Sequence, residues 1–194
     1  MPRSRLPRSL PQTALLVATI AAALSTLAGC PKGKGGTGGS GGKSCLTAQK
    51  CYDYTCYKPG ATRSFRTDVL PIFEQSCSLS SSCHGDPQSP TTSLGYQPYL
   101  GKTSMDMNPS DITKIFATVV GQASPAATNE KIIDPGKPET SFLMQKMDGA
   151  VSCATLSCAA AAACGTSMPQ GVDPLPMATR DTIRDWIKQG AMNN

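Results

Sequence analysis

The chain has 194 residues, of which 18 are lysine or arginine and 13 are aspartate or glutamate, giving a formal net charge of +5. Three of the cations, Arg3, Arg5 and Arg8, stand at the N-terminus, so the remainder holds 15 basic residues against 13 acidic ones. This near balance, without a cluster of lysine and arginine, excludes a nucleic-acid partner, which needs a basic patch. The chain that follows the N-terminal segment suits one domain of ordinary size.

The first predicted element is an export signal over residues 1–29. Its arginines precede an apolar, alanine-rich stretch that is too short to span a membrane comfortably. It ends in Leu-Ala-Gly followed by Cys30, which resembles the lipobox of bacterial lipoproteins, where the cysteine is lipidated and becomes the first mature residue. Pro31, in place of the aspartate that often retains lipoproteins at the inner membrane, favours the outer membrane. The alternative is an ordinary cleaved secretory signal with a chance cysteine, and both imply export.

Two short segments separate this signal from the main domain. Residues 30–44, after the initial Cys30 and Pro31, are rich in glycine with lysine, serine and threonine, and they cannot bury enough apolar surface to fold. We expect a flexible tether with an average reach of about 20 Å. Residues 45–60 are rich in cysteine and tyrosine and have no helical or strand period. We interpret them as an extension pinned by disulfides, which leaves residues 61–194 as the main domain.

The main domain is predicted to be mostly α, a small helical domain with long loops. Apolar side chains recur at helical spacing in four stretches, which are bounded by capping or stop residues. The predicted helices run from 64 to 77, from Asp111 to Val119, from 139 to 147, and from the cap Thr179 to the stop Gly190. No strand pair stands out, and residues 89–101 are interpreted as loop. We expect the first and last helices to pack together.

The only histidine, His84, directly follows Cys83. A cysteine beside a histidine is the minimum needed to hold a c-type haem, because the thiol tethers the porphyrin and the imidazole coordinates its iron. Far downstream, Met168 precedes Pro-Gln-Gly, and its thioether could fill the opposite axial position and raise the reduction potential. Methionines at helical positions are more often core residues. Other thioethers in the domain are those of Met144, Met147 and Met177.

The main domain also contains five short motifs whose order and spacing form a set. They are Asp-Val-Leu-Pro-Ile-Phe at 68–73, Ser-Cys-His-Gly at 82–85, Asp-Pro-Gly-Lys-Pro-Glu-Thr-Ser-Phe-Leu at 134–143, Met-Pro-Gln-Gly at 168–171 and Ile-Arg-Asp-Trp-Ile-Lys-Gln-Gly-Ala at 183–191. The set resembles the small c-type cytochrome domains of exported, often lipid-anchored proteins from bacteria such as myxobacteria and planctomycetes. The resemblance implies a cytochrome c-like fold, with crossing terminal helices and one covalent haem c between the His84 and Met168 loops.

The spacing of the cysteines departs from the usual attachment motif, C-x-x-C-H. The residue at its first position is Ser80, and five residues separate the nearest upstream thiol, Cys77, from Cys83. Three arrangements remain open: both cysteines bond the haem, Cys83 alone forms a thioether, or Cys77 and Cys83 form a disulfide in a domain without haem. In the last case His84 is a surface turn residue before Gly85. Single attachment would leave Cys77 as a free thiol, which an oxidising compartment disfavours.

Six further cysteines lie outside this motif: Cys45, Cys51, Cys56, Cys153, Cys158 and Cys164. These six cysteines can form three disulfides, and in a domain without haem Cys77 and Cys83 could form a fourth. Because the number of cysteines is even in both cases, it does not distinguish a domain with haem from one without. Disulfides would compensate for a core with only four phenylalanines and one tryptophan, and a buried porphyrin would fill such a core instead. A zinc site built from the last three of these cysteines and His84 matches in ligand type only, because exported thiols oxidise.

These residues predict an electron carrier: a lipid-anchored monohaem c-type cytochrome of the bacterial cell envelope. Cys77 and Cys83 would attach the haem, and His84 and Met168 would be its axial ligands. Full axial ligation leaves no open position for a substrate, so no enzyme activity is expected. The expected partners are the membrane, through the lipid, and redox proteins of the envelope. The alternative, from a different class, is a haem-free envelope lipoprotein braced by disulfides, with a structural or interaction role.

Overall fold

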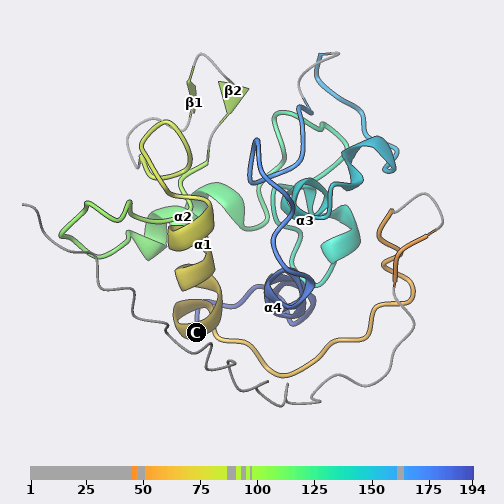
Figure 1. Cartoon of the computed structure of the whole chain (residues 1–194), viewed down its shortest axis with the longest axis horizontal. Helices are drawn as coiled ribbons and strands as arrows, with labels where there is room; N and C mark the ends of the chain where they lie inside the picture. The colour runs from red at the N-terminus through yellow and green to blue at the C-terminus, as the bar shows by residue number, and fades with distance from the viewer. Residues whose placement is uncertain (1–44, 48–50, 87–90, 93–94, 97, 161–163) are drawn as a thin grey trace, which may run out of the picture. The chain divides into compact units, whose positions relative to one another are not determined.

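The computed structural model describes most of the main domain and part of its extension (Figure 1). The described residues are 45–47, 51–86, 91–92, 95–96, 98–160 and 164–194. The predicted export signal, the lipidation site Cys30 and the tether lie outside these residues. The chain divides into two units, Met1–Gly42 and Lys43–Asn194, and the second contains every described residue. Among the described helices, none has the length and apolar character needed to cross a membrane.

Helices dominate the described part of the domain (Figure 1). A single π-helical turn, η1 (Phe65–Val69), runs directly into α1 (Leu70–Ser76). The other helices are α2 (Ile112–Val119), the 3₁₀ turn η2 (Pro138–Thr140), α3 (Phe142–Met147), the 3₁₀ turn η3 (Ala150–Ser152) and α4 (Met177–Lys188). The prediction of a small, mostly helical domain is confirmed.

A short strand pair, absent from the sequence prediction, interrupts the segment that was interpreted as loop. The strands β1 (Thr91–Thr92) and β2 (Gly95–Tyr96) are antiparallel, with Thr91 opposite Tyr96 and Thr92 opposite Gly95. Each strand has two residues, which is too short for the alternation of apolar and polar side chains that identifies a strand in a sequence. It is the one sheet in the described part of the chain.

The first predicted helix, residues 64–77, is confirmed as η1 followed by α1. Its apolar stripe faces the interior, where three side chains are fully buried: Phe65, Val69 and Phe73. Asp68 secures the start of this helix, because its carboxylate accepts the backbone N–H of Ser64 at 2.7 Å. The helix ends at Ser76 and delivers the chain to Cys77.

The capping predictions for the two later helices have different outcomes. The cap of α2 is confirmed, since Asp111 Oδ1 accepts the backbone N–H of Lys114 at 2.9 Å. The predicted start of α4 is wrong, because the helix begins at Met177, before Thr179. The carbonyl of Pro176 accepts the backbone N–H of Thr179 at 3.0 Å, so the backbone of Pro176, rather than the Thr179 hydroxyl, satisfies the first turn.

The first and last helices pack against each other, as predicted. The ring centroid of Phe65 in η1 lies 5.2 Å from that of Trp186 in α4, and Trp186 is 1% exposed. Asn194 lies beside the start of η1 (Figure 1), where its side-chain oxygen accepts the backbone N–H of Phe65 at 2.8 Å. The core extends from this contact through Tyr99, Leu100, Ile115, Val119, Ile132, Ile133, Leu143, Met144, Met147, Ile183 and Ile187.

Three disulfides join the six cysteines that lie outside the His84 motif: Cys45–Cys56, Cys51–Cys153 and Cys158–Cys164. The second fastens the extension to the segment that follows α3, and the other two each close a local loop. Because cytosolic reductants keep thiols reduced, three disulfides suggest an extracytoplasmic protein.

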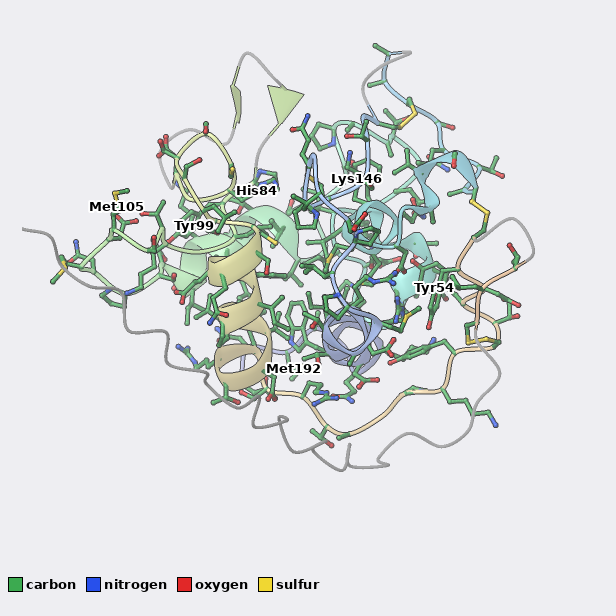
Figure 2. The ribbon with its side chains drawn as sticks, viewed as in Figure 1. Tyr54, His84, Tyr99, Met105, Lys146 and Met192 are labelled. Atoms are coloured by element: carbon green, nitrogen blue, oxygen red, sulfur yellow. A yellow bond between two sulfur atoms is a disulfide. The ribbon has the colours of Figure 1, made fainter. Side chains whose placement is uncertain are left out.

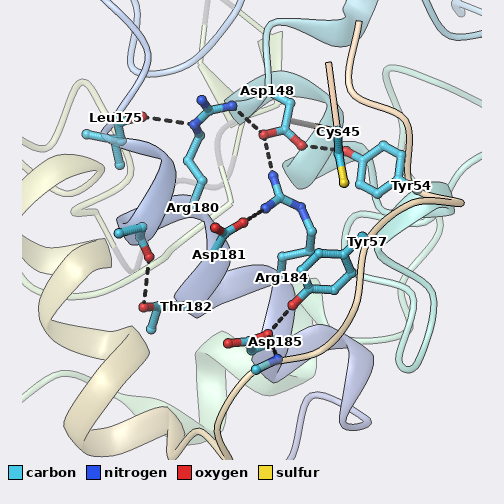
Figure 3. A network of polar contacts seen from close by, with 12 residues as sticks. Cys45, Tyr54, Tyr57, Asp148, Leu175, Arg180, Asp181, Thr182, Arg184 and Asp185 are labelled. Atoms are coloured by element: carbon cyan, nitrogen blue, oxygen red, sulfur yellow. Dashed lines mark hydrogen bonds and ion pairs between the residues drawn. The ribbon is translucent and has the colours of Figure 1, made fainter. Parts of the chain in front are cut away.

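A buried ionic cluster also ties the extension to α3 and α4 (Figure 3). Asp148, directly after α3, accepts hydrogen bonds from Arg180 and Arg184 of α4, each at 2.6 Å. The hydroxyl of Tyr54 donates to the same carboxylate at 2.7 Å. The guanidinium carbon of Arg184, whose side chain is fully buried, lies 3.8 Å from the centroid of the Tyr52 ring. Charge-assisted hydrogen bonds and ring stacking therefore hold the extension in place.

The cluster predicts an unusual titration of its tyrosines. Burial, opposed by the Arg184 charge, raises the pKa of Tyr52 to about 12, and burial also raises the pKa values of Tyr54 and Tyr57. The folded protein therefore holds these protons more tightly than the unfolded chain, in which tyrosine titrates near pH 10. Below about pH 10, these tyrosines should leave the free energy of unfolding unchanged. Above about pH 10, they should lower the free energy of unfolding as the pH rises. Denaturant unfolding at a series of alkaline pH values measures this, and a constant value above about pH 10 would contradict it.

Candidate haem site

All four residues predicted to hold a haem line one cavity. Its volume is about 330 Å³, within the range of ligand-binding cavities. Cys77, Cys83 and His84 come from the segment after α1, whereas Met168 comes from the loop between η3 and α4. The apolar part of the lining consists of Leu79, Pro98, Leu100, Ile132, Phe142, Leu143, Met147 and Pro169. The fold thus brings the predicted thiols, imidazole and thioether to one apolar space.

The loop from Cys77 to His84 folds back on itself despite its unusual length. The backbone N–H of His84 donates to the carbonyl of Cys77 at 3.1 Å, which closes the loop. Inside the loop, the carbonyl of Ser80 accepts the backbone N–H of Cys83 at 3.0 Å. Within the loop, Leu79, Ser81 and Ser82 are exposed to solvent, whereas Ser78 is fully buried. The five-residue spacing therefore still places Cys77 beside the Cys83-His84 pair.

The imidazole of His84 is held by a backbone carbonyl. Its Nδ1 lies 2.9 Å from the carbonyl oxygen of Pro98, so Nδ1 carries a proton and donates it. Burial lowers the pKa of His84, which favours the neutral form of the ring. No described residue makes a hydrogen bond with Nε2. An imidazole oriented in this way, with one nitrogen lone pair available, is ready to coordinate a metal.

Cys77 and Cys83 are the two described cysteines that form no disulfide. Burial, reinforced by the neighbouring Cys83 thiol, raises the pKa of Cys77 to about 12. The hydroxyl of Ser80 donates to the sulfur of Cys83 at 3.3 Å. Two neighbouring thiols outside the cytosol normally oxidise to a disulfide. Here both thiols are free, whereas the other described cysteines form disulfides. Two free thiols of this kind are suited to covalent attachment of a haem.

Met168 is the thioether that the loop before α4 brings to the cavity. Its backbone N–H donates to the carbonyl of Lys146 at 2.9 Å, which ties this loop to α3. Of the other methionines, Met147 also lines the cavity but belongs to the buried core, and Met144 is fully buried. Met177 is not among the lining residues. Two thiols, an imidazole and a thioether around an apolar space suit an iron porphyrin, so the residues present fit a haem.

Several residues that complete the cavity were not predicted as part of the site. Pro98 and Leu100 come from a segment that was interpreted as loop, and nothing in its composition indicates a contact with His84. Lys146 was also missed, although it lies in a predicted helix. Phe142 carried a signal, because it falls in one of the five matched motifs.

Two other candidate sites lack the required chemistry. The cysteines of the proposed zinc set, Cys153, Cys158 and Cys164, are all in disulfides and so cannot act as ligands with His84. A larger cavity, of about 700 Å³, lies against the same loop, but no cysteine or histidine is among the residues described in its lining. The smaller cavity is therefore the candidate site.

The chain matches no protein-family model, no curated protein and no solved structure. Its function is therefore inferred from the motifs and from the geometry of the cavity.

Gly85 is required by the close packing of the His84 loop. A Cβ added at this position would lie 2.5 Å from the Cγ2 methyl of Thr103 and 2.9 Å from the carbonyl oxygen of Ser80. Gly85→Ala should therefore displace the loop and lower the free energy of unfolding by about 1–3 kcal/mol, as overpacking does. Denaturant unfolding measures the loss, and Thr103→Ser, which removes the methyl, should recover part of it. Unchanged stability in Gly85→Ala would contradict this packing.

Proposed function

We propose that the protein is a lipid-anchored c-type cytochrome that carries one covalent haem c and transfers electrons in the bacterial cell envelope. The observation that carries the proposal is the single cavity lined by two free thiols, an imidazole with an available Nε2 and a thioether. The packing of the first and last helices supports a cytochrome c-like fold for the domain. The five sequence motifs support the same class of protein.

Each site residue has a separate role in this proposal. Cys77 and Cys83 would hold the macrocycle through thioethers, and the hydrogen bond to Pro98 would present Nε2 of His84 to the metal. Met168 would provide the second axial ligand, and the apolar lining would exclude water from both ligands. The haem supplies an iron that accepts and releases one electron. Because both axial positions would be filled, we expect electron transfer without catalysis.

The location in the envelope rests on the disulfides and on the N-terminal sequence. Three disulfides support a place outside the cytoplasm, and the Leu-Ala-Gly-Cys30 sequence supports a lipid anchor. The glycine-rich residues 31–44 would let the domain reach membrane-bound donors and acceptors. Pro31 favours the outer membrane, and the expected partners are redox proteins of the envelope.

Expression of the chain with its own signal, in a host that performs c-type haem maturation, tests the proposal. After extraction with acidified organic solvent, which removes noncovalent haem, the intact mass should exceed that of the polypeptide by one haem. The reduced protein should show the sharp absorption bands of a low-spin haem, and Met168→Ala should change them. A colourless protein with every thiol oxidised would contradict the proposal. It would support instead the haem-free envelope lipoprotein braced by disulfides.

A further inference from the structure

Lys146 places a positive charge in the wall of the haem cavity. It belongs to α3, and Figure 2 shows it in the same region of the domain as His84, which lines the same cavity. Its ammonium group donates to the carbonyl oxygen of Cys164 at 2.6 Å. The Nζ atom also lies 5.6 Å from the ring centroid of Phe142, another lining residue. Among the described lining residues, Lys146 is the one lysine or arginine, and none is an aspartate or glutamate.

No carboxylate compensates this charge in the part of the chain that the structure describes. Lys146 takes part in none of the ion pairs between described residues. The described lining of the cavity contains no aspartate or glutamate. An ammonium group has three N–H donors, and the carbonyl of Cys164 occupies one of them. Gly165 lets the backbone pass close to the group, because a Cβ there would lie only 3.1 Å from Nζ.

The buried arginines of the domain, unlike Lys146, bind a carboxylate. Arg180 and Arg184 both bind the carboxylate of Asp148 at 2.6 Å, so their charges are compensated inside the protein. A half-buried ammonium group without a counter-charge loses hydration and gains little in return. The position of Lys146, held by one backbone carbonyl and the Phe142 ring, therefore lacks the carboxylate that would compensate its charge. It suits a group that meets an anion when the cavity is filled.

We propose that Lys146 binds a carboxylate of the ligand held in this cavity. The inference rests on the proposed function, in which the ligand is a tetrapyrrole, an apolar macrocycle that carries two carboxylates. The apolar lining would contact the macrocycle, and Nζ would bind one carboxylate by a charge-assisted hydrogen bond. Lys146 would thereby select an acidic porphyrin over an uncharged one of the same shape.

Porphyrin affinity in a chain that cannot form thioethers tests this role. The full chain with Cys77→Ser and Cys83→Ser is titrated with iron protoporphyrin IX and with its dimethyl ester, and absorbance gives the two dissociation constants. With Lys146 present, the acid should bind about tenfold more tightly than the ester, the factor expected for one charge-assisted hydrogen bond. Lys146→Gln should abolish this preference and leave the affinity for the ester unchanged. Lys146→Arg, which keeps the charge, should restore most of the preference.

The other outcomes separate this inference from the proposed function. A preference for the acid that survives Lys146→Gln would overturn the inference and leave the proposed function standing. If Lys146→Gln weakened the binding of the acid and of the ester by the same factor, Lys146 would act only on the shape of the cavity. That result would also overturn the inference. Binding of neither probe, with Lys146 present, would overturn the inference. The proposed function, which relies on the two cysteines that this chain lacks, is decided separately by the covalent haem of the unaltered chain.

Discussion

Replacement of Asp148 by asparagine is expected to lower the free energy of unfolding by about 3–5 kcal/mol. The side chains of Asp148 and Arg184 are fully buried, and that of Arg180 is 10% exposed. The variant would leave both guanidinium groups inside the protein without the carboxylate that they share. Asp181 would still pair with Arg184, but it lies nearer the surface. Denaturant unfolding with the disulfides intact measures the loss.

An exposed ion pair provides the control for Asp148. Lys131 binds Asp134 at 2.8 Å, and the Lys131 side chain is 48% exposed. Lys131→Gln should therefore change the free energy of unfolding by less than about 1 kcal/mol. Equal, small losses for Asp148→Asn and Lys131→Gln would contradict the central role of Asp148 in the buried cluster.

The largest effect on haem content is expected at Cys83. It is adjacent to His84 in one tight loop, so an axially bound haem would be held beside its thiol. We expect Cys83→Ser to lose more covalent haem than Cys77→Ser, although each variant keeps one cysteine that can form a thioether. The intact mass after acid extraction measures the haem that stays on each variant. Full covalent haem in Cys83→Ser would contradict the role of the thiol beside His84.

Ser80 offers a matched control for the spacing of the two attachment sites. It occupies the first position of the usual C-x-x-C-H motif, and its hydroxyl lies 3.3 Å from the Cys83 sulfur. In a chain that carries Cys77→Ser, the further change Ser80→Cys should therefore restore the second thioether. Absence of a second thioether in this variant would show that the loop does not present position 80 to the haem.

Local signals predicted most of the helices because helix starts and stops depend on nearby residues. The stripe through Phe65 and Phe73 predicted η1 and α1, and the Asp111 side chain caps α2 within its own first turn. Gly149, with a φ of 65°, lies just beyond α3, where glycine commonly ends a helix. The start of α4 was missed because the carbonyl of Pro176 accepts a backbone N–H of the first turn, which the Thr179 hydroxyl was expected to cap.

The contacts that shape the site were harder to predict because they join distant segments. The carbonyl that orients His84 belongs to Pro98, fourteen residues away, in a segment without a periodic pattern. The Cys51–Cys153 disulfide spans 102 residues, and a count of cysteines cannot reveal such a pairing. The stacking of Arg184 on Tyr52 also could not be predicted from the residues next to either side chain. Such contacts follow from tertiary packing, which hydrophobic periodicity does not encode.

A single tryptic peptide contains both of the cysteines proposed to hold the haem. Trypsin cleavage after Arg66 and Lys102 would release residues 67–102, which include both cysteines and His84. Tandem mass spectrometry of this peptide, from protein made with c-type haem maturation, shows which sulfurs carry the macrocycle. We expect one haem bonded through both Cys77 and Cys83. A haem-free peptide in which these two cysteines form a disulfide would contradict it.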